Sequence, residues 1–245
     1  MSEAQLLDLK RIIIDASINA PRSQQKTIGP SEVGEPCARK LAYKLLDIEP
    51  RNTATDPLPS LVGTGAHAWL ADAFLAWNEA NGRKRFWVEE KVTCGPVVGS
   101  CDLYDADTLT AIDHKFPGVT AMDRYRKNGP SDVYRIQAHL YGMGHRDAGR
   151  PVEHVAIVFY PRGGMLGDAF MWAEPFDEAI AEAAIERLMG IAAATDVWLS
   201  TTGDKAQAIG AIEPTTSRLC NWCEYLSYGS TDLARGCPGE GVPEV

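Results

Sequence analysis

The sequence contains no long apolar run, and none of its segments approaches the ~20 apolar residues that a membrane-spanning helix requires. It also has no internal repeat and no low-complexity segment. Its polar start, Met1-Ser-Glu-Ala, lacks the form of a signal peptide. We therefore expect a cytoplasmic protein without a membrane partner. Of its 245 residues, 45% are hydrophobic and 23% are charged, which is ordinary for a globular chain.

An excess of basic residues is also missing. The 24 Lys and Arg residues are outnumbered by 33 Asp and Glu residues, which gives a net charge of −9 at pH 7. This balance argues against a protein that coats nucleic acid nonspecifically. It does not exclude a protein that holds DNA in a local groove, because the field depends on where the charges lie. Basic residues cluster at 83–85, at 124–127 and around Arg135, and solvated faces explain these clusters equally well.

Hydrophobic periodicity and turn residues predict an α/β protein with a mixed sheet. Helical spacing occurs over residues 2–15, 31–46, 61–80, 131–145 and 177–200. Extended segments are predicted at residues 85–93, 96–103, 108–116, 152–160 and 168–172. The central order is therefore a helix, three strands, a helix, two strands and a helix.

Two short stretches carry most of the chemical information. Gly99-Ser-Cys-Asp102 lies in one predicted strand, and Ile112-Asp113-His114-Lys115 lies in its predicted hairpin partner. Because side chains alternate along a strand, Asp113 and Lys115 share a face. Two carboxylates beside a lysine make a compact site for Mg²⁺ or Mn²⁺, which prefer oxygen ligands and accept phosphate oxygens. An Asp-x-Lys pair by itself is more often a surface ion pair, so the remaining residues decide between these interpretations.

Three further residues add to this pattern. His67, in Gly63-Thr-Gly-Ala-His67, lies in the predicted helix before the strands, and imidazole is a suitable ligand for Mn²⁺. The two glycines each cost the helix about 1 kcal/mol, which suggests a close approach at this turn. Gln137 and Tyr141 are four residues apart and share a helix face, from which they could contact a DNA backbone or orient the lysine.

In order, Gly63-x-x-x-His67, Gly99-x-x-Asp102, Asp113-x-Lys115 and Gln137-x-x-x-Tyr141 resemble the RecB-like branch of the PD-(D/E)XK nucleases. Cysteines on both sides of this region resemble the iron–sulfur subgroup, which includes CRISPR-associated nucleases, AddB-type nuclease domains and phage recombination exonucleases. The resemblance covers about residues 31–237. It implies an α/β, restriction-endonuclease-like core, with a mixed sheet flanked by helices, and a single nuclease domain over residues 1–245.

The resemblance further implies metal-dependent hydrolysis of DNA phosphodiester bonds, by an exonuclease rather than an endonuclease. Recombination, repair or end processing, a phage origin, and a recombination or replication partner protein are further expectations. The implied site residues are the metal ligands His67, Asp102, Asp113 and the His114 carbonyl, the catalytic residues Asp102, Asp113 and Lys115, and the DNA-binding residues Gln137 and Tyr141. Lys115 would position the attacking water. At Asp113 the sequence departs from the branch, in which glutamate is commoner.

Four of the six cysteines are candidate ligands of a second metal group, because cysteines in a cytoplasmic chain indicate metal binding or reactivity rather than disulfides. Cys220-Asn-Trp-Cys223 forms a Cys-x-x-Cys hook, and Cys237 and the distant Cys37 complete the set. Four thiolates can hold a [4Fe–4S] cluster or a structural Zn²⁺, and the spacing does not distinguish these.

The resemblance favours the iron–sulfur cluster. It would join the N- and C-terminal segments, near residues 31–46 and 217–237, and thereby act as a structural staple. Cys237 departs from the subgroup because thirteen residues separate it from the hook. Cys94 and Cys101 lie in predicted strands and are expected to be core residues.

Two alternative functions stay open. The first is a non-catalytic DNA- or protein-binding module on a nuclease-like scaffold, although the complete set of His67, Asp102, Asp113 and Lys115 argues against a degenerate core. The second is a nuclease with a zinc staple and endonuclease or nickase activity.

Overall fold

A computed structural model of the chain describes residues 3–20, 25–52 and 56–239. The chain divides into two compact units. The first unit consists of residues 1–28, 37–61 and 191–245, and the second of residues 29–36 and 62–190. The single nuclease domain expected over residues 1–245 stays a prediction.

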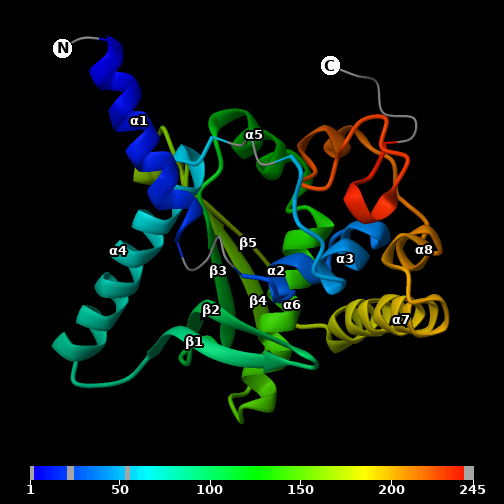
Figure 1. Ribbon diagram of the computed structural model, residues 1–245. Helices are drawn as coiled ribbons and strands as arrows, with labels where there is room; N and C mark the ends of the chain where they lie inside the picture. The colour runs from blue at the N-terminus through cyan, green and yellow to red at the C-terminus, as the bar shows by residue number, and fades with distance from the viewer. Residues whose placement is uncertain (1–2, 21–24, 53–55, 240–245) are drawn as a thin grey trace. The chain divides into compact units, whose positions relative to one another are not determined.

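A five-stranded mixed sheet forms the centre of the second unit (Figure 1). In order across the sheet, the strands are β1 (Phe86–Cys94), β2 (Val97–Asp105), β3 (Thr110–Lys115), β4 (His154–Phe159) and β5 (Phe170–Pro175). β3 and β4 are parallel, and every other neighbouring pair is antiparallel. The α/β class and the mixed sheet flanked by helices are therefore confirmed.

Two tight connections set the register of the first three strands. Gly95 and Pro96 join β1 to β2, with Gly95 at a φ of 60° that glycine adopts without strain, so that Cys94 pairs with Val97. A short turn joins β2 to β3 and pairs Asp105 with Thr110. Because a shift of one residue would turn every side chain to the opposite face, these connections determine which carboxylates meet.

Helices cover both faces of this sheet. α6 (Asp132–Asp147) lies against β1, β3 and β4, and its residues 137–145 are buried. On the opposite face, α4 (Leu58–Ala80) packs through Phe74 and Trp77, whose rings lie 4.9 and 5.1 Å from that of Phe86. α6 and α4 therefore flank the strands that carry the predicted site.

Several helices differ from the sequence-based expectations. The helix predicted over residues 31–46 is two helices, α2 (Pro30–Val33) and α3 (Ala38–Leu45). Pro36 lies between them, and a proline disfavours helical conformation in the residue before it. The short helices α5 (Val119–Asn128) and α8 (Lys205–Gly210) were not expected.

The first unit has its own apolar core. Tyr43 and Tyr225 stack with ring centroids 4.8 Å apart, and Leu46, Ala208 and Ile209 surround them. Its remaining elements are α1 (Glu3–Ile18), the end of α7 (Glu178–Thr202), and the 3₁₀ helices η2 (Arg218–Trp222) and η3 (Leu233–Arg235); a further 3₁₀ helix, η1 (Leu166–Asp168), belongs to the second unit.

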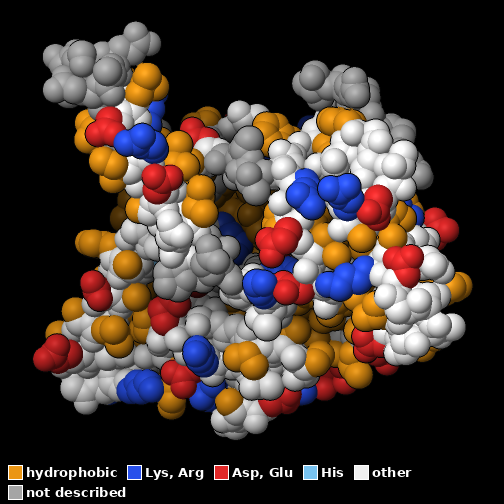
Figure 2. Space-filling model, in the orientation of Figure 1, with side chains coloured by type: hydrophobic (Ala, Val, Ile, Leu, Met, Phe, Trp, Pro, Cys, Tyr) orange, Lys and Arg blue, Asp and Glu red, His pale blue; other side chains and the backbone are white. Residues whose placement is uncertain are grey.

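α1 exposes apolar side chains along its length, as Figure 2 shows. The exposed residues are Leu6, Leu7, Leu9, Ile12, Ile13, Ile14 and Ile18. Even so, none of the helices in the described part of the chain is long and apolar enough to cross a membrane.

Candidate active site

Asp102 and Asp113 lie where β2 and β3 separate. The backbone pairing of these strands ends at Leu103 and Ile112, one residue before the two aspartates would face each other. In place of a strand-to-strand bond, the backbone N–H of His114 donates a hydrogen bond of 2.7 Å to Asp102 Oδ2. The backbone of β3, the strand that carries Asp113, therefore also holds the Asp102 carboxylate in place.

Asp113 and Lys115 share a face of β3 and meet α6, as the alternation of the strand predicts. Lys115 Nζ lies 2.6 Å from Asp113 Oδ2 and donates a hydrogen bond of 3.0 Å to Gln137 Oε1. Gln137 Nε2 donates to Asp113 Oδ1 at 3.2 Å and to the Tyr141 hydroxyl at 3.3 Å. The buried Gln137 thus holds the acid–lysine pair in place, which was one of the two expected roles; its contact with DNA, like that of Tyr141, stays a prediction.

The Asp113 carboxylate is in an environment that disfavours its charge. Its side chain is only 3% exposed. Burial raises the pKa of Asp113 to about 6, the Lys115 ammonium opposes this rise, and the Asp102 carboxylate adds to it. Perturbed carboxylates of this kind concentrate at functional sites, although structural ion pairs also produce them.

His67 approaches the same region from α4. Its Nδ1 lies 3.4 Å from Asp102 Oδ2. Burial lowers the pKa of His67, but the Asp102 and Asp113 carboxylates outweigh this effect and the pKa is raised. Burial would raise the pKa of Asp102, but His67 and the His114 N–H outweigh it and the pKa is lowered. The ion-pair geometry therefore favours a charged Asp102 beside the imidazole.

The glycines before His67 do not mark a close approach within the described part of the chain. A Cβ atom built on Gly63 or Gly65 would meet no atom within 4 Å. The glycine that a close approach does require is Gly99, where a Cβ would lie 2.6 Å from Pro30 Cδ. In the predicted motif Gly99-x-x-Asp102, the glycine therefore serves packing of β2 beneath α2.

The side chain of His114 points to the face opposite Asp113. Its ring stacks on Phe74 with centroids 5.9 Å apart and an interplanar angle of 3°. Burial lowers the pKa of His114 to about 4, so the ring is neutral at pH 7. Ligation by the backbone carbonyl of His114 stays a prediction.

One set of potential metal-ligating atoms is closely gathered among the residues that the structure describes. Each of His67, Glu89 and Asp102 offers one ligand atom, and these atoms lie within 4.8 Å of one another. Imidazole nitrogen and carboxylate oxygen suit Mn²⁺ and are compatible with Mg²⁺, so these residues fit a divalent cation. Asp113 does not belong to this set.

Glu89 is not among the site residues predicted from the sequence. The signal that could have identified it is the register of the first hairpin. The Gly95-Pro96 turn pairs Cys94 with Val97, and counting back along both strands brings Glu89 opposite Asp102. That step requires the exact pairing, which periodicity alone does not provide.

The four cysteines predicted to bind metal all belong to the first unit. Cys37 precedes α3 as its N-cap, and its Sγ accepts a hydrogen bond of 3.5 Å from the Thr215 N–H. Cys223 and Cys237 pack against the core around Tyr43. No three cysteine sulfurs lie within 4.8 Å of one another in the described residues, so a cluster-like arrangement is not shown.

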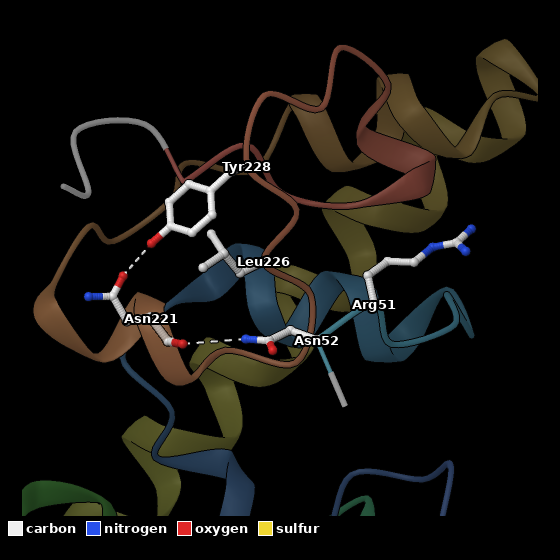
Figure 3. Close-up of a pocket in the computed structure, with 5 residues that line it drawn as sticks. All are labelled: Arg51, Asn52, Asn221, Leu226 and Tyr228. Carbon is white, nitrogen blue, oxygen red and sulfur yellow. Dashed lines mark hydrogen bonds between the residues drawn. The ribbon is translucent and has the colours of Figure 1, made fainter. Parts of the chain in front are cut away.

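Loop contacts hold the Cys220–Cys223 hook. Asn52 Nδ2 donates hydrogen bonds to the carbonyl oxygens of Asn221, at 3.3 Å, and of Cys223, at 3.2 Å. The Tyr228 hydroxyl donates to Asn221 Oδ1 at 2.6 Å. Together with Arg51 and Leu226, these asparagines and Tyr228 line a cavity of about 310 Å³ (Figure 3). Side-chain hydrogen bonds therefore position the segment around Cys220 and Cys223, which belongs to no strand or long helix.

Cys94 and Cys101 are fully buried, as expected for core residues. Burial raises the pKa of Cys94 to about 12, and that of Cys101 well above its ordinary value. Both therefore remain neutral thiols at pH 7 and are poor metal ligands or nucleophiles.

No family model and no curated protein matches the sequence. Among solved structures, the chain is similar to an alkaline exonuclease (LHK-Exo) from Laribacter hongkongensis, with a TM-score of 0.51 and 14% identity over 74% of this chain and 94% of that chain. A phage-related exonuclease from Haemophilus somnus 129PT gives a TM-score of 0.45 and 15% identity over 67% of this chain and 81% of that chain. The first likeness concerns the fold alone and agrees with a mixed α/β sheet flanked by helices.

Proposed function

We propose that this protein is a metal-dependent deoxyribonuclease, and an exonuclease rather than an endonuclease. The observation that carries the proposal is the meeting of Asp102, Asp113 and Lys115 where β2 and β3 separate. The likeness in fold to the alkaline exonuclease supports the same conclusion. The complete set of His67, Asp102, Asp113 and Lys115 favours a catalytic protein over a non-catalytic binding module on a degenerate core.

His67, Asp102, Asp113 and the His114 carbonyl are the proposed cation ligands. A divalent cation in such a site lowers the pKa of water and neutralises charge on a phosphate. The carboxylates that would bind the cation are held by the protein itself. Asp102, for example, accepts a hydrogen bond from the His114 N–H of β3.

Lys115 is the proposed group that orients the attacking water and stabilises charge on the phosphate. A lysine ammonium has three donors, of which one is directed at Gln137 Oε1, and its charge pairs with Asp113 Oδ2 at 2.6 Å. The ammonium therefore keeps donor capacity for water or a phosphate oxygen. The Tyr134 ring, 4.7 Å from Nζ, adds a cation–π contact that limits movement of the side chain.

The test is a cleavage assay with end-labelled single- and double-stranded DNA, in the presence of Mg²⁺ or Mn²⁺ and separately with EDTA. We expect nucleotides to be released from DNA ends only with the metal, and covalently closed circular DNA to remain intact. Nicking of the circle would instead show an endonuclease. Absence of cleavage with both metals would favour the non-catalytic module.

We extend the proposal to the biological role. Removal of nucleotides from DNA ends is what recombination, repair and end processing require, so we place the protein in one of these processes. A recombination or replication protein would then be its partner. A cytoplasmic location and a phage origin belong to the same proposal.

We also propose that Cys37, Cys220, Cys223 and Cys237 hold a [4Fe–4S] cluster, with a structural Zn²⁺ as the alternative. The Cys-x-x-Cys spacing and the location of all four in one unit support this. Sulfur ligands lie about 2.3 Å from a zinc ion. Because no three of these sulfurs are within 4.8 Å of one another in the described part of the chain, a zinc ion would require them to close in.

Metal analysis of anaerobically purified protein tests the cysteine proposal. We expect iron together with broad absorption near ~400 nm, typical of thiolate-ligated clusters. Cys223→Ala should lose the iron, whereas the matched control Cys94→Ala, in the core of the second unit, should retain it. Stoichiometric zinc without iron would replace the cluster by the zinc alternative, and absence of both metals would contradict the staple.

A further inference from the structure

We propose that Glu89 is a metal ligand, which completes a divalent-cation site with His67 and Asp102. This inference rests on the proposed nuclease function and assigns its cation to a set of residues that includes Glu89. Glu89 thereby joins the ligands proposed above, and the acid–lysine pair of Asp113 and Lys115 lies next to the three residues whose ligand atoms gather.

The three side chains come from three elements, α4, β1 and β2, and converge on one point. Their ligand atoms lie within 4.8 Å of one another, which no other combination of three His, Cys, Asp or Glu residues achieves in the described ranges. The set combines an imidazole nitrogen with two carboxylate oxygens. That donor mixture suits Mn²⁺, and the two carboxylates supply the negative charge that a divalent ion requires.

β1 changes the direction of its side chains at Glu89. Phe86 faces α4, where its ring lies 4.9 Å from that of Phe74. Val92, six residues later, faces α6 instead, because a Cβ built on Gly144 would lie 2.8 Å from Val92 Cβ. Residues an even number apart share a face in a regular strand, so the alternation reverses between them. Glu89 lies in this interval with a φ of 49°, in the left-handed region.

β2 reverses at the matching place. Gly99 lies under α6, since a Cβ there would be 3.3 Å from Tyr141 Cε1. Tyr104 also faces α6, with its ring 4.7 Å from that of His145. Gly99 and Tyr104 are five residues apart and would face opposite sides of a regular strand, so the alternation of β2 reverses between them. Asp102 lies between Gly99 and Tyr104. Asp102 and Glu89 are opposite each other in the register but do not form a backbone pair, although the residues on either side of them do. Local irregularities of this kind re-aim side chains beside active sites.

The left-handed backbone at Glu89 costs energy that glycine or asparagine would avoid. Packing does not explain the choice of glutamate, because its side chain is exposed. A carboxylate re-aimed toward His67 and Asp102 does explain it.

Asp113 occupies a different environment. Both of its carboxylate oxygens have close neighbours on the α6 face, Lys115 at 2.6 Å and Gln137 at 3.2 Å. Glu89, in contrast, lies with its ligand atom beside those of His67 and Asp102. The geometry therefore gives Glu89 the shorter reach to a cation between His67 and Asp102.

The experiment is a Mn²⁺ titration of the full-length protein, followed by the electron paramagnetic resonance signal of free Mn²⁺. Glu89→Gln preserves the size of the side chain and removes its charge, and we expect Kd to rise about tenfold or more. Glu90→Gln is the matched control, because this neighbouring glutamate lies 4.0 Å from Arg150 and outside the proposed set. Its Kd should stay within about twofold of the wild-type value.

Glu89→Gly separates ligation from folding, since glycine adopts the backbone conformation of Glu89 freely. We expect its thermal unfolding to match that of the wild type while its Mn²⁺ affinity falls as in Glu89→Gln. A purely structural Glu89 would instead lose stability and leave the affinity unchanged.

Unchanged Mn²⁺ affinity in Glu89→Gln would overturn the inference. A loss of Mn²⁺ affinity in Glu90→Gln as large as that in Glu89→Gln would also overturn it, because both losses would then follow from the change in net charge. If the wild type still cleaved DNA in either case, the proposed function would stand. Conversely, Glu89-dependent Mn²⁺ binding in a protein that cleaves no DNA would support this inference and contradict the proposed nuclease.

Discussion

The acid–lysine region and the cysteine region are built in different ways. Asp113 and Lys115 lie 2.6 Å apart on β3, where both residues pair with β4, and the His114 N–H holds the Asp102 carboxylate beside this strand. The cysteines stand at an N-cap, in a 3₁₀ turn and in loops, and no three of their sulfurs lie within 4.8 Å in the described residues. Regular pairing positions side chains without a ligand, whereas loop residues depend more on what they bind. We therefore expect the first region to be preformed and the second to need its metal.

The largest expected effect is on catalysis. Asp113→Ala and Lys115→Ala should each reduce DNA cleavage by at least about 10²–10³-fold, because each removes preorganised charge from the site. Lys115→Ala should retain Mn²⁺ affinity near that of the wild type, since lysine is not a ligand. End-labelled DNA cleavage and Mn²⁺ titration measure the two quantities. Lys91→Ala, an exposed lysine on β1, is the control, and wild-type cleavage by either site variant would show that the active centre lies elsewhere.

Metal removal should affect the two regions unequally. Treatment of the wild type with EDTA should abolish cleavage and shift Tm by only a few degrees, because the strands already hold the carboxylates. Cys223→Ala should lower Tm by on the order of 10 °C, since loss of a structural metal site removes several kcal/mol of stability. Thermal unfolding followed by circular dichroism measures both. Equal shifts in Tm would contradict the distinction between a preformed and a metal-dependent region.

Gln137 tests how strongly α6 maintains the acid–lysine pair. Gln137→Ala removes the acceptor for Lys115 and the donor to Asp113, so kcat should fall by about 10–100-fold while KM changes little. Steady-state kinetics separates these parameters. Gln207→Ala, an exposed glutamine on α8, should leave both unchanged. A rise in KM alone would instead support the predicted contact of Gln137 with DNA.

The smallest expected effect concerns the turn that sets the register of β2 and β3. Asp105 accepts hydrogen bonds from Arg85 at 2.7 Å and from the Asp107 N–H at 3.0 Å. Burial would raise the pKa of Asp105, but Arg85 and the turn donors outweigh it and the pKa is lowered. Asp105→Asn should therefore lower the free energy of unfolding by about 1–3 kcal/mol at pH 7.

The pH dependence of this effect follows from the lowered pKa. The stability that Asp105 contributes is present above the pKa of an unfolded aspartate, about 3.9. It is lost as pH falls through the lower pKa of the folded state. Urea unfolding at several pH values should thus show the wild type and Asp105→Asn converging below about pH 4. A constant difference down to pH 2 would contradict the assigned charge interaction.

Local patterns carried much of the prediction. The alternation of β3 correctly put Asp113 and Lys115 on one face, and the helical spacing of Gln137 and Tyr141 correctly put these two side chains on one face of α6, where they are hydrogen-bonded. The break between α2 and α3 was missed because the helix predicted over residues 31–46 runs through Pro36, which disfavours helical conformation in the residue before it. Glu89 was missed because its relation to Asp102 depends on strand register and on a left-handed residue that periodicity does not reveal.

The sequence by itself determined the α/β class, the hairpin turns and the residues that share a face, because these depend on contacts between near neighbours in the chain. Only the tertiary structure decided that β2 and β3 separate at Asp102, that Gln137 contacts both Asp113 and Lys115, and that Glu89 joins His67 and Asp102. These relations bring together residues from separate elements. They follow from packing of α4 and α6 on the sheet, whose geometry no local pattern encodes.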